Sequence, residues 1–114
     1  MIKELMRRIL NFKHHVEGQI LARQIKVIPQ ANSIWRDYVF EKDYALLSFS
    51  ELRKFLLIEK HLPEIPSEAE LKDIGHYNLA TMDASILKKL EESYLYILQL
   101  EARIAALEKT ATKN

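Results

Sequence analysis

A heptad repeat of apolar residues in the last third of the chain constrains the fold more than any other feature. Leu90, Ile97 and Ile104 fit heptad position a, and only Ser93 interrupts the apolar residues at position d. This spacing predicts a helix from about 78 to 108 and a coiled coil over 78–110. The apolar residues that would form its interface, here called the seam, are Ile86, Leu90, Ile97, Leu100, Ile104 and Leu107.

Two observations bear on what the seam contacts. Charged residues occupy the outer heptad positions, which favours association with other helices. Tyr94 and Leu87 widen the apolar stripe, which favours the alternative that the helix packs back on its own domain. The charged outer residues are Lys88, Glu91, Glu101, Arg103 and Glu108.

A second heptad pattern begins the chain and stops at Gly18. It predicts an oligomerising helix over 1–17 that also contacts other proteins. A basic amphipathic membrane helix is the alternative, but Glu4 and Glu17 interrupt the basic face. The predicted interface residues are Ile2, Leu5, Ile9, Phe12 and Val16.

The segment 18–34 is predicted to form a short β-strand and a loop. Leu21, Ile25 and Val27 alternate with polar residues, and β-branched residues are frequent over 19–28. Pro29 lacks a backbone donor and ends the pattern.

The segment 35–77 is predicted to form a small helical domain. Ser48 and Glu51 fit a capping box that begins a helix ending near His61. A second short helix begins after Ser67 and ends at Gly75. Two prolines between these helices prevent a continuous helix and predict a turn. The predicted turn residues are His61, Pro63, Pro66 and Ser67.

The stretch WRDYVFEKDY, residues 35–44, holds four of the ten aromatic residues of the chain among five charged ones. Large aromatic side chains bury roughly 150–250 Å² each, so they can form a core where regular elements are few. An exposed platform that stacks on glycans or bases is the alternative. The predicted aromatic core is Trp35, Tyr38, Phe40 and Tyr44.

Composition excludes several classes of function. Seventeen basic and 16 acidic residues nearly cancel, which argues against a nucleic-acid partner. No apolar run approaches a membrane span, and the absence of cysteine excludes disulfides and thiolate chemistry. The four histidines lack metal-ligand spacing, and there is no glycine-rich phosphate loop or nucleophile elbow. We therefore expect a protein that is not an enzyme and holds no metal or cofactor.

Three motifs occur in order over about residues 16–104: WRDYVFEKDYALLS, KHLPEIPSEAEL and IGHYNLATMDASILKKLEESYLYILQLE. Together they resemble the C-terminal domain of long fibre-like and surface proteins of Bacteroidota and their phages. The resemblance implies a trimerisation or folding cap. The chain departs from that pattern at Ala80, where glycine is usual, and at Ser93, where leucine is usual. A heptad segment also precedes the domain in place of a long repeat-bearing stalk.

The sequence thus predicts a mainly α protein with a short β segment. We expect an elongated parallel homo-oligomer in which N-terminal and C-terminal coiled-coil helices flank a small aromatic-cored domain. Isoleucine at position a with leucine at position d favours a two-stranded coiled coil, whereas the resemblance implies a homotrimer. It also implies a fibre-like or adaptor component of a phage or contractile injection particle, in a virion or extracellular particle, or alternatively at the bacterial cell surface. The functional alternative is a trimerisation or folding chaperone that assists assembly of a fibre.

Overall fold

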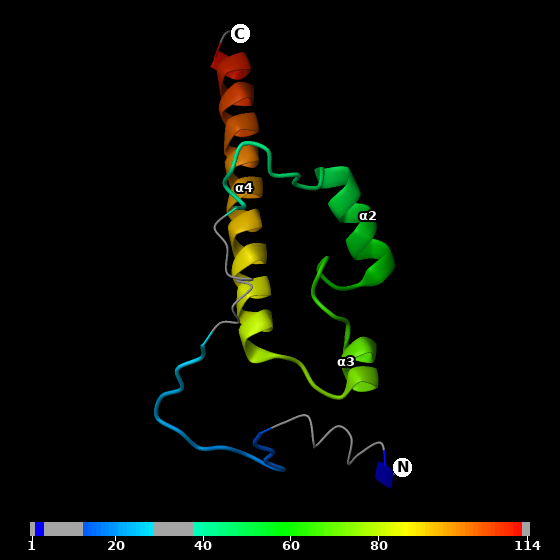
Figure 1. The fold of residues 1–114 in the computed structure, drawn as a ribbon. Coiled ribbons are helices and arrows are strands. Elements are labelled where there is room, and N and C mark those ends of the chain that lie inside the picture. Colours follow the sequence, from blue (N-terminus) through cyan, green and yellow to red (C-terminus); the bar gives the residue numbers. More distant parts are fainter. Residues whose placement is uncertain (1, 4–12, 29–37, 113–114) are drawn as a thin grey trace.

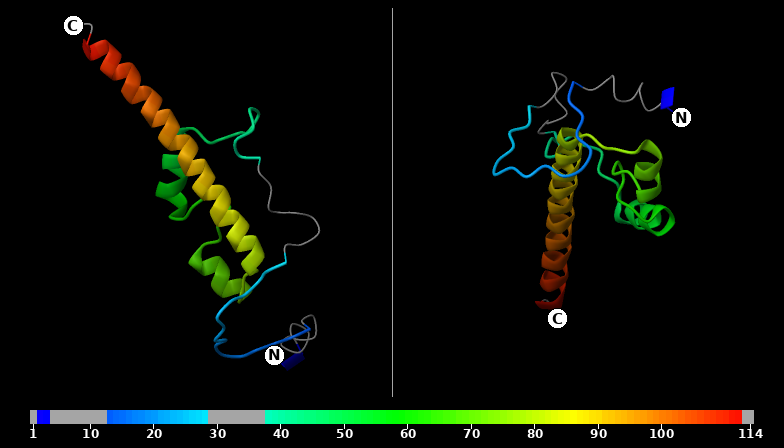
Figure 2. Two further views of the ribbon diagram at one scale, coloured as in Figure 1. Left: turned by 90° about the vertical axis from the view of Figure 1, so that its left-hand side faces the viewer. Right: turned by 90° about the horizontal axis from the view of Figure 1, so that it is seen from below.

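The structure, a computed structural model, describes residues 2–3, 13–28 and 38–112. It is mainly helical and elongated, with extents of 73 × 31 × 29 Å. Helices α2 (Phe49–Glu59), α3 (Glu68–Ile74) and α4 (Leu79–Thr112) follow one another along the chain. In Figures 1 and 2, α4 forms a long rod, and α2 and α3 lie along one side of it. The C-terminal end of α4 projects beyond both of them.

Helix α4 begins at a local capping interaction. The backbone N–H of Thr81 donates to the Asn78 side-chain oxygen at 3.0 Å, which satisfies one of the free donors of the first turn. The helix then continues to Thr112 without a break. The predicted C-terminal helix is therefore confirmed.

Helix α2 begins with the predicted capping box. Ser48 accepts from the Glu51 backbone N–H at 3.1 Å, and the Ser48 backbone N–H donates to the Glu51 carboxylate at 3.1 Å. Lys60 ends the helix in the left-handed conformation, with φ at 62°.

Helix α3 has the predicted ends as well. The Ser67 hydroxyl accepts from the Glu70 backbone N–H at 3.1 Å. Gly75 closes the helix with φ at 89°, a conformation that costs glycine little, and its N–H donates to the Leu71 carbonyl at 2.8 Å.

The chain leaves unusually much surface exposed. Its accessible surface is 10729 Å², whereas a compact monomer of this mass exposes about 6,500 Å². Val39 and Ala84 are the apolar side chains that are buried in the described part of the chain. A single copy therefore has almost no closed core.

The prediction of a strand over 19–28 is not confirmed. Residues 13–28 contain neither helix nor strand, and Leu21 is fully exposed. A strand is stabilised by hydrogen bonds to a neighbouring strand, and the described residues of one copy contain no other strand.

The predicted N-terminal helix is helical at residues 2–3 but not at 13–17. Ile2 and Val16 are exposed, whereas Leu5, Ile9 and Phe12 lie outside the described residues. A short helix gains most of its stability from packing. Val16 is 59 % exposed in the single chain, so little packing is available there to stabilise a helix.

Candidate functional site

We call residues 38–77, which include α2 and α3, the cap. The cap wraps around part of α4, because the segment 38–47 lies on one side of the rod and α2 and α3 lie on another (Figures 1 and 2). Ala84 of α4 is buried. The half-buried residues of α4 are Ala80, Met82, Ser85, Leu87, Lys88, Lys89, Glu91, Glu92, Leu95 and Tyr96.

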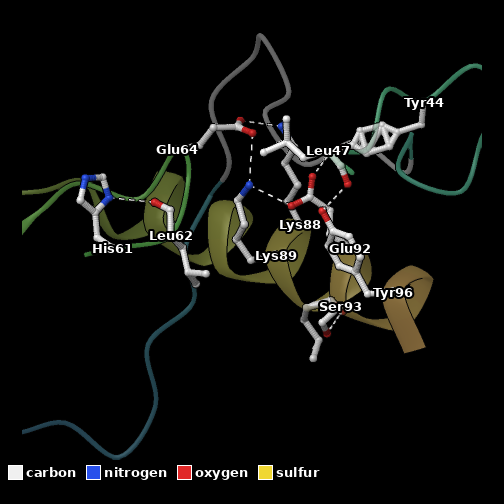
Figure 3. A network of polar contacts seen from close by, with 11 residues as sticks. Tyr44, Leu47, His61, Leu62, Glu64, Lys88, Lys89, Glu92, Ser93 and Tyr96 are labelled. Atoms are coloured by element: carbon white, nitrogen blue, oxygen red, sulfur yellow. Dashed lines mark hydrogen bonds and ion pairs between the residues drawn. The ribbon is translucent and has the colours of Figure 1, made fainter. Parts of the chain in front are cut away.

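A chain of polar contacts joins the cap to α4, as Figure 3 shows. The Tyr44 hydroxyl donates to the carboxylate of Glu92. Glu92 in turn accepts from the Lys89 ammonium at 2.8 Å, and Lys89 reaches Glu64 at 3.3 Å. Lys88 forms a second ion pair with Glu64 at 2.5 Å.

The environment of this network shifts the pKa of its members. Burial opposes ionisation of Glu64, but the hydrogen bonds and charges of Lys88 and Lys89 outweigh it, so its carboxyl pKa lies below the usual value. Burial likewise opposes the charge of Lys88, but Glu64 raises the net pKa of that ammonium. Burial and the neighbouring Glu92 carboxylate raise the pKa of the Tyr44 phenol. Glu64 and Lys88 are thus charged at neutral pH, and Tyr44 is a neutral donor.

A second set of contacts joins the N-terminus of α2 to α4. The Tyr96 hydroxyl donates to the Leu47 carbonyl oxygen at 2.8 Å, and its ring lies 5.1 Å from that of Phe49. The Arg103 guanidinium lies 5.9 Å from the centre of the Phe49 ring on its face.

The predicted aromatic core is only partly a core. Trp35 lies outside the described residues, and Phe40 is 59 % exposed, whereas Val39 beside it is 1 % exposed. Tyr38 is exposed too, with its ring 5.3 Å from the Lys88 ammonium and 5.8 Å from the ring of Tyr44. The tight turn at 39–43 points neighbouring side chains in different directions. Both tyrosines contact the polar network, and their rings also meet edge to face at an interplanar angle of 77°.

The predicted turn residues lie at the edge of the site. His61 packs edge-on against Phe55 at 5.6 Å, and its Nδ1 lies 2.9 Å from the Leu62 carbonyl oxygen. Pro66 is half-buried, and Pro63 lines a pocket. The capping role expected for Ser67 is confirmed.

The pocket lies between α2, the turn at 62–64 and α4, and has a volume of about 490 Å³. Its walls are apolar where Leu47, Leu52 and Leu62 contribute, and polar where the network lines it. Lys89, Glu92, Ser93 and Tyr96 form its α4 side. Sequence reasoning missed this pocket and its residue Glu64, because Glu64 and its lysine partners are far apart in the chain.

The seam remains open on the other side of α4. All six of its residues are between 45 % and 69 % exposed. Successive residues of an α-helix are rotated by about 100°, so Ile86 lies about half a turn around the helix from half-buried Leu95. Tyr94, at heptad position e, extends the exposed apolar stripe, whereas Leu98 lines a pocket with Val39 and Phe40 of the cap. The middle of the covered surface, at Ala84 and Leu95, is therefore opposite the seam, whereas Lys89 and Tyr96 lie at the border between the cap and the seam.

Comparison with known protein families, with curated proteins and with solved structures found no match to this chain. In the part of the chain that the structure describes, no cluster of three or more histidine, aspartate or glutamate residues is placed to bind a metal ion. The described helices also include none with the length and apolarity needed to cross a membrane.

Proposed function

We propose that this protein is a structural component that assembles into a parallel homo-oligomer through the seam of α4. The observation that carries this proposal is the exposed apolar stripe of the seam. Contiguous apolar surface on that scale marks an interaction site, and heptad spacing fits it to other helices of the same kind. A second copy of the chain is the occupant to which the pattern is complementary.

Charge supports a parallel arrangement. In the heptad register, Arg103 is at position g and Glu108 is at position e of the following heptad. Such residues face each other across a parallel, in-register interface. Opposite charges at this pair favour identical copies in the same direction.

We propose three copies rather than two. The a and d residues alone lean towards a dimer, but the exposed stripe is wider than a and d because Tyr94 at position e belongs to it. A wider stripe contacts two neighbours. The resemblance noted above also implies a trimer.

As to biological role, we propose a fibre-like or adaptor part of a phage or contractile injection particle. Support comes from the ordered motifs over about 16–104 and from the rod-like shape of the chain. The second candidate is an assembly chaperone. In its favour, the C-terminal end of α4 projects beyond α2 and α3, and the seam residues there are exposed. Mass spectrometry of the mature particle separates the two, since a structural part is retained and a chaperone is absent.

Oligomerisation through the seam of α4 can be tested directly. Light scattering of the purified protein at micromolar concentration should give a mass three times 13.4 kDa. Ile104→Asp buries a charge in the seam and should yield monomers. Ala106→Asp, a matched control with the same charge on the other side of α4, should remain a trimer. A monomeric parent protein would refute the proposal.

A further inference from the structure

We infer that Tyr94 of each copy inserts into the pocket between the cap and α4 of the adjacent copy. The inference rests on the proposed parallel oligomer and deepens it, because it makes the cap part of the interface. Its basis is the position of the pocket relative to the heptad register.

The pocket is lined by α4 residues that belong to the seam or lie beside it. Its α4 side includes Ser93 at position d, and Lys89 and Tyr96 at position g. Position g of one helix faces position e of the next heptad in a parallel neighbour. The residue that faces Lys89 in this way is Tyr94 of the adjacent copy, which is 56 % exposed in the single chain.

The lining of the pocket suits a tyrosine. The ring would lie against Leu47, Leu52 and Leu62, and the hydroxyl would reach the polar end. The Lys89 ammonium has three N–H donors, of which Glu64 and Glu92 accept two in the described part of the chain. We expect the third N–H to donate to the phenolic oxygen of the incoming side chain.

Ser93 keeps the entrance of the pocket clear. Its hydroxyl donates to the carbonyl oxygen of Leu90 at 2.6 Å, so its hydrogen bond is made within its own helix. A leucine at this position would extend towards the neighbouring helix and narrow the entrance. The small side chain of Ser93, which interrupts the seam, thus leaves room for Tyr94 of the neighbour to enter.

Site-specific photo-crosslinking tests the insertion directly. The aromatic photo-reactive residue p-benzoylphenylalanine replaces Tyr94 in the full chain, and the crosslinked peptides are identified by mass spectrometry. We expect crosslinks between copies to Leu52, Leu62 or Pro63. The matched control carries the same residue in place of Tyr77, which is equally exposed but lies outside α4, and should give no crosslink to these positions.

The outcomes separate this inference from the proposed function. A trimer by light scattering with crosslinks only to α4 of the neighbour would overturn the insertion and leave the coiled coil intact. A monomer by light scattering would overturn both. Two variants extend the test: Tyr94→Ala should weaken association about tenfold or more, and Ser93→Leu should reduce the crosslinks to the cap. Undiminished crosslinks in Ser93→Leu would overturn the role given to Ser93.

Discussion

The Tyr96 hydroxyl donates a hydrogen bond to the Leu47 carbonyl oxygen over 2.8 Å, which joins α4 to the residue just before the N-cap of α2. The two residues are 49 positions apart in the chain. With the Phe49 ring against Tyr96 and the Arg103 guanidinium over Phe49, this contact holds the start of α2 on the rod.

Tyr96→Phe should therefore lower the free energy of unfolding by about 1 kcal/mol, because it removes the hydrogen bond and keeps the ring. Tyr96→Ala should cost more, since the ring contact with Phe49 is lost as well. Urea denaturation followed by circular dichroism measures both. Tyr77→Phe, at an exposed loop position, is the control and should unfold like the parent. Equal midpoints for Tyr96→Phe and the parent would show that this hydrogen bond adds no stability.

The ion pairs of Glu64 should make stability depend on acid pH. The pKa of Glu64 is lowered in the folded chain, so its contribution is present above its unfolded value of 4.5 and is lost as the pH falls through the folded pKa. Because its side chain is 56 % exposed, solvent screening limits the effect to less than about 1 kcal/mol. Thermal melts between about pH 7 and about pH 3, a range that includes the usual carboxyl pKa values, should show a smaller loss of stability on acidification for Glu64→Gln than for the parent.

Glu68→Gln serves as the matched control for that measurement. Glu68 pairs with Lys72 within α3 at 3.1 Å, and both side chains are highly exposed. Its replacement should leave the acid dependence unchanged. If Glu64→Gln and Glu68→Gln behave alike, the network does not account for the pH response.

The N-cap residue Ser67 should contribute measurably to the free energy of unfolding. Ser67→Ala removes the acceptor of the Glu70 N–H and should cost about 1 kcal/mol. Replacement of Pro66 by alanine should cost about 0.4–1 kcal/mol, mainly because the unfolded chain gains freedom. Ser50→Ala, in the exposed first turn of α2, is the control. Melting of Ser67→Ala with the parent would contradict the capping assignment.

The buried residue of the stretch 38–44 should matter more to stability than its exposed aromatic neighbour. Val39→Ala should cost about 2 kcal/mol because its site is closed. Phe40→Ala should change the stability of a single chain by less than about 1 kcal/mol. The two are compared by denaturation in the Ile104→Asp background, in which the seam is disabled. A larger loss of stability for Phe40→Ala than for Val39→Ala would support the aromatic core predicted from the sequence.

The sequence was sufficient for everything that depends on near neighbours in the chain. The capping serines Ser48 and Ser67, the stop at Gly75 and the long C-terminal helix are confirmed, because each involves hydrogen bonds or steric limits over a few residues. The heptad pattern also identified the stripe that one copy leaves uncovered. The strand over 19–28 was not confirmed, because a strand requires a partner that local sequence does not specify.

Only the tertiary structure decided which residues meet across the chain. It brought Glu64 to Lys88 and Lys89, placed Tyr44 on Glu92, and buried Val39 while exposing Phe40. It also placed the pocket beside Ser93 and left the seam residues exposed. These relationships depend on how the turns at 39–43 and 60–67 direct the chain back along α4. Local periodicity determines which face of a helix is apolar, whereas the path of the connecting chain determines which face is covered.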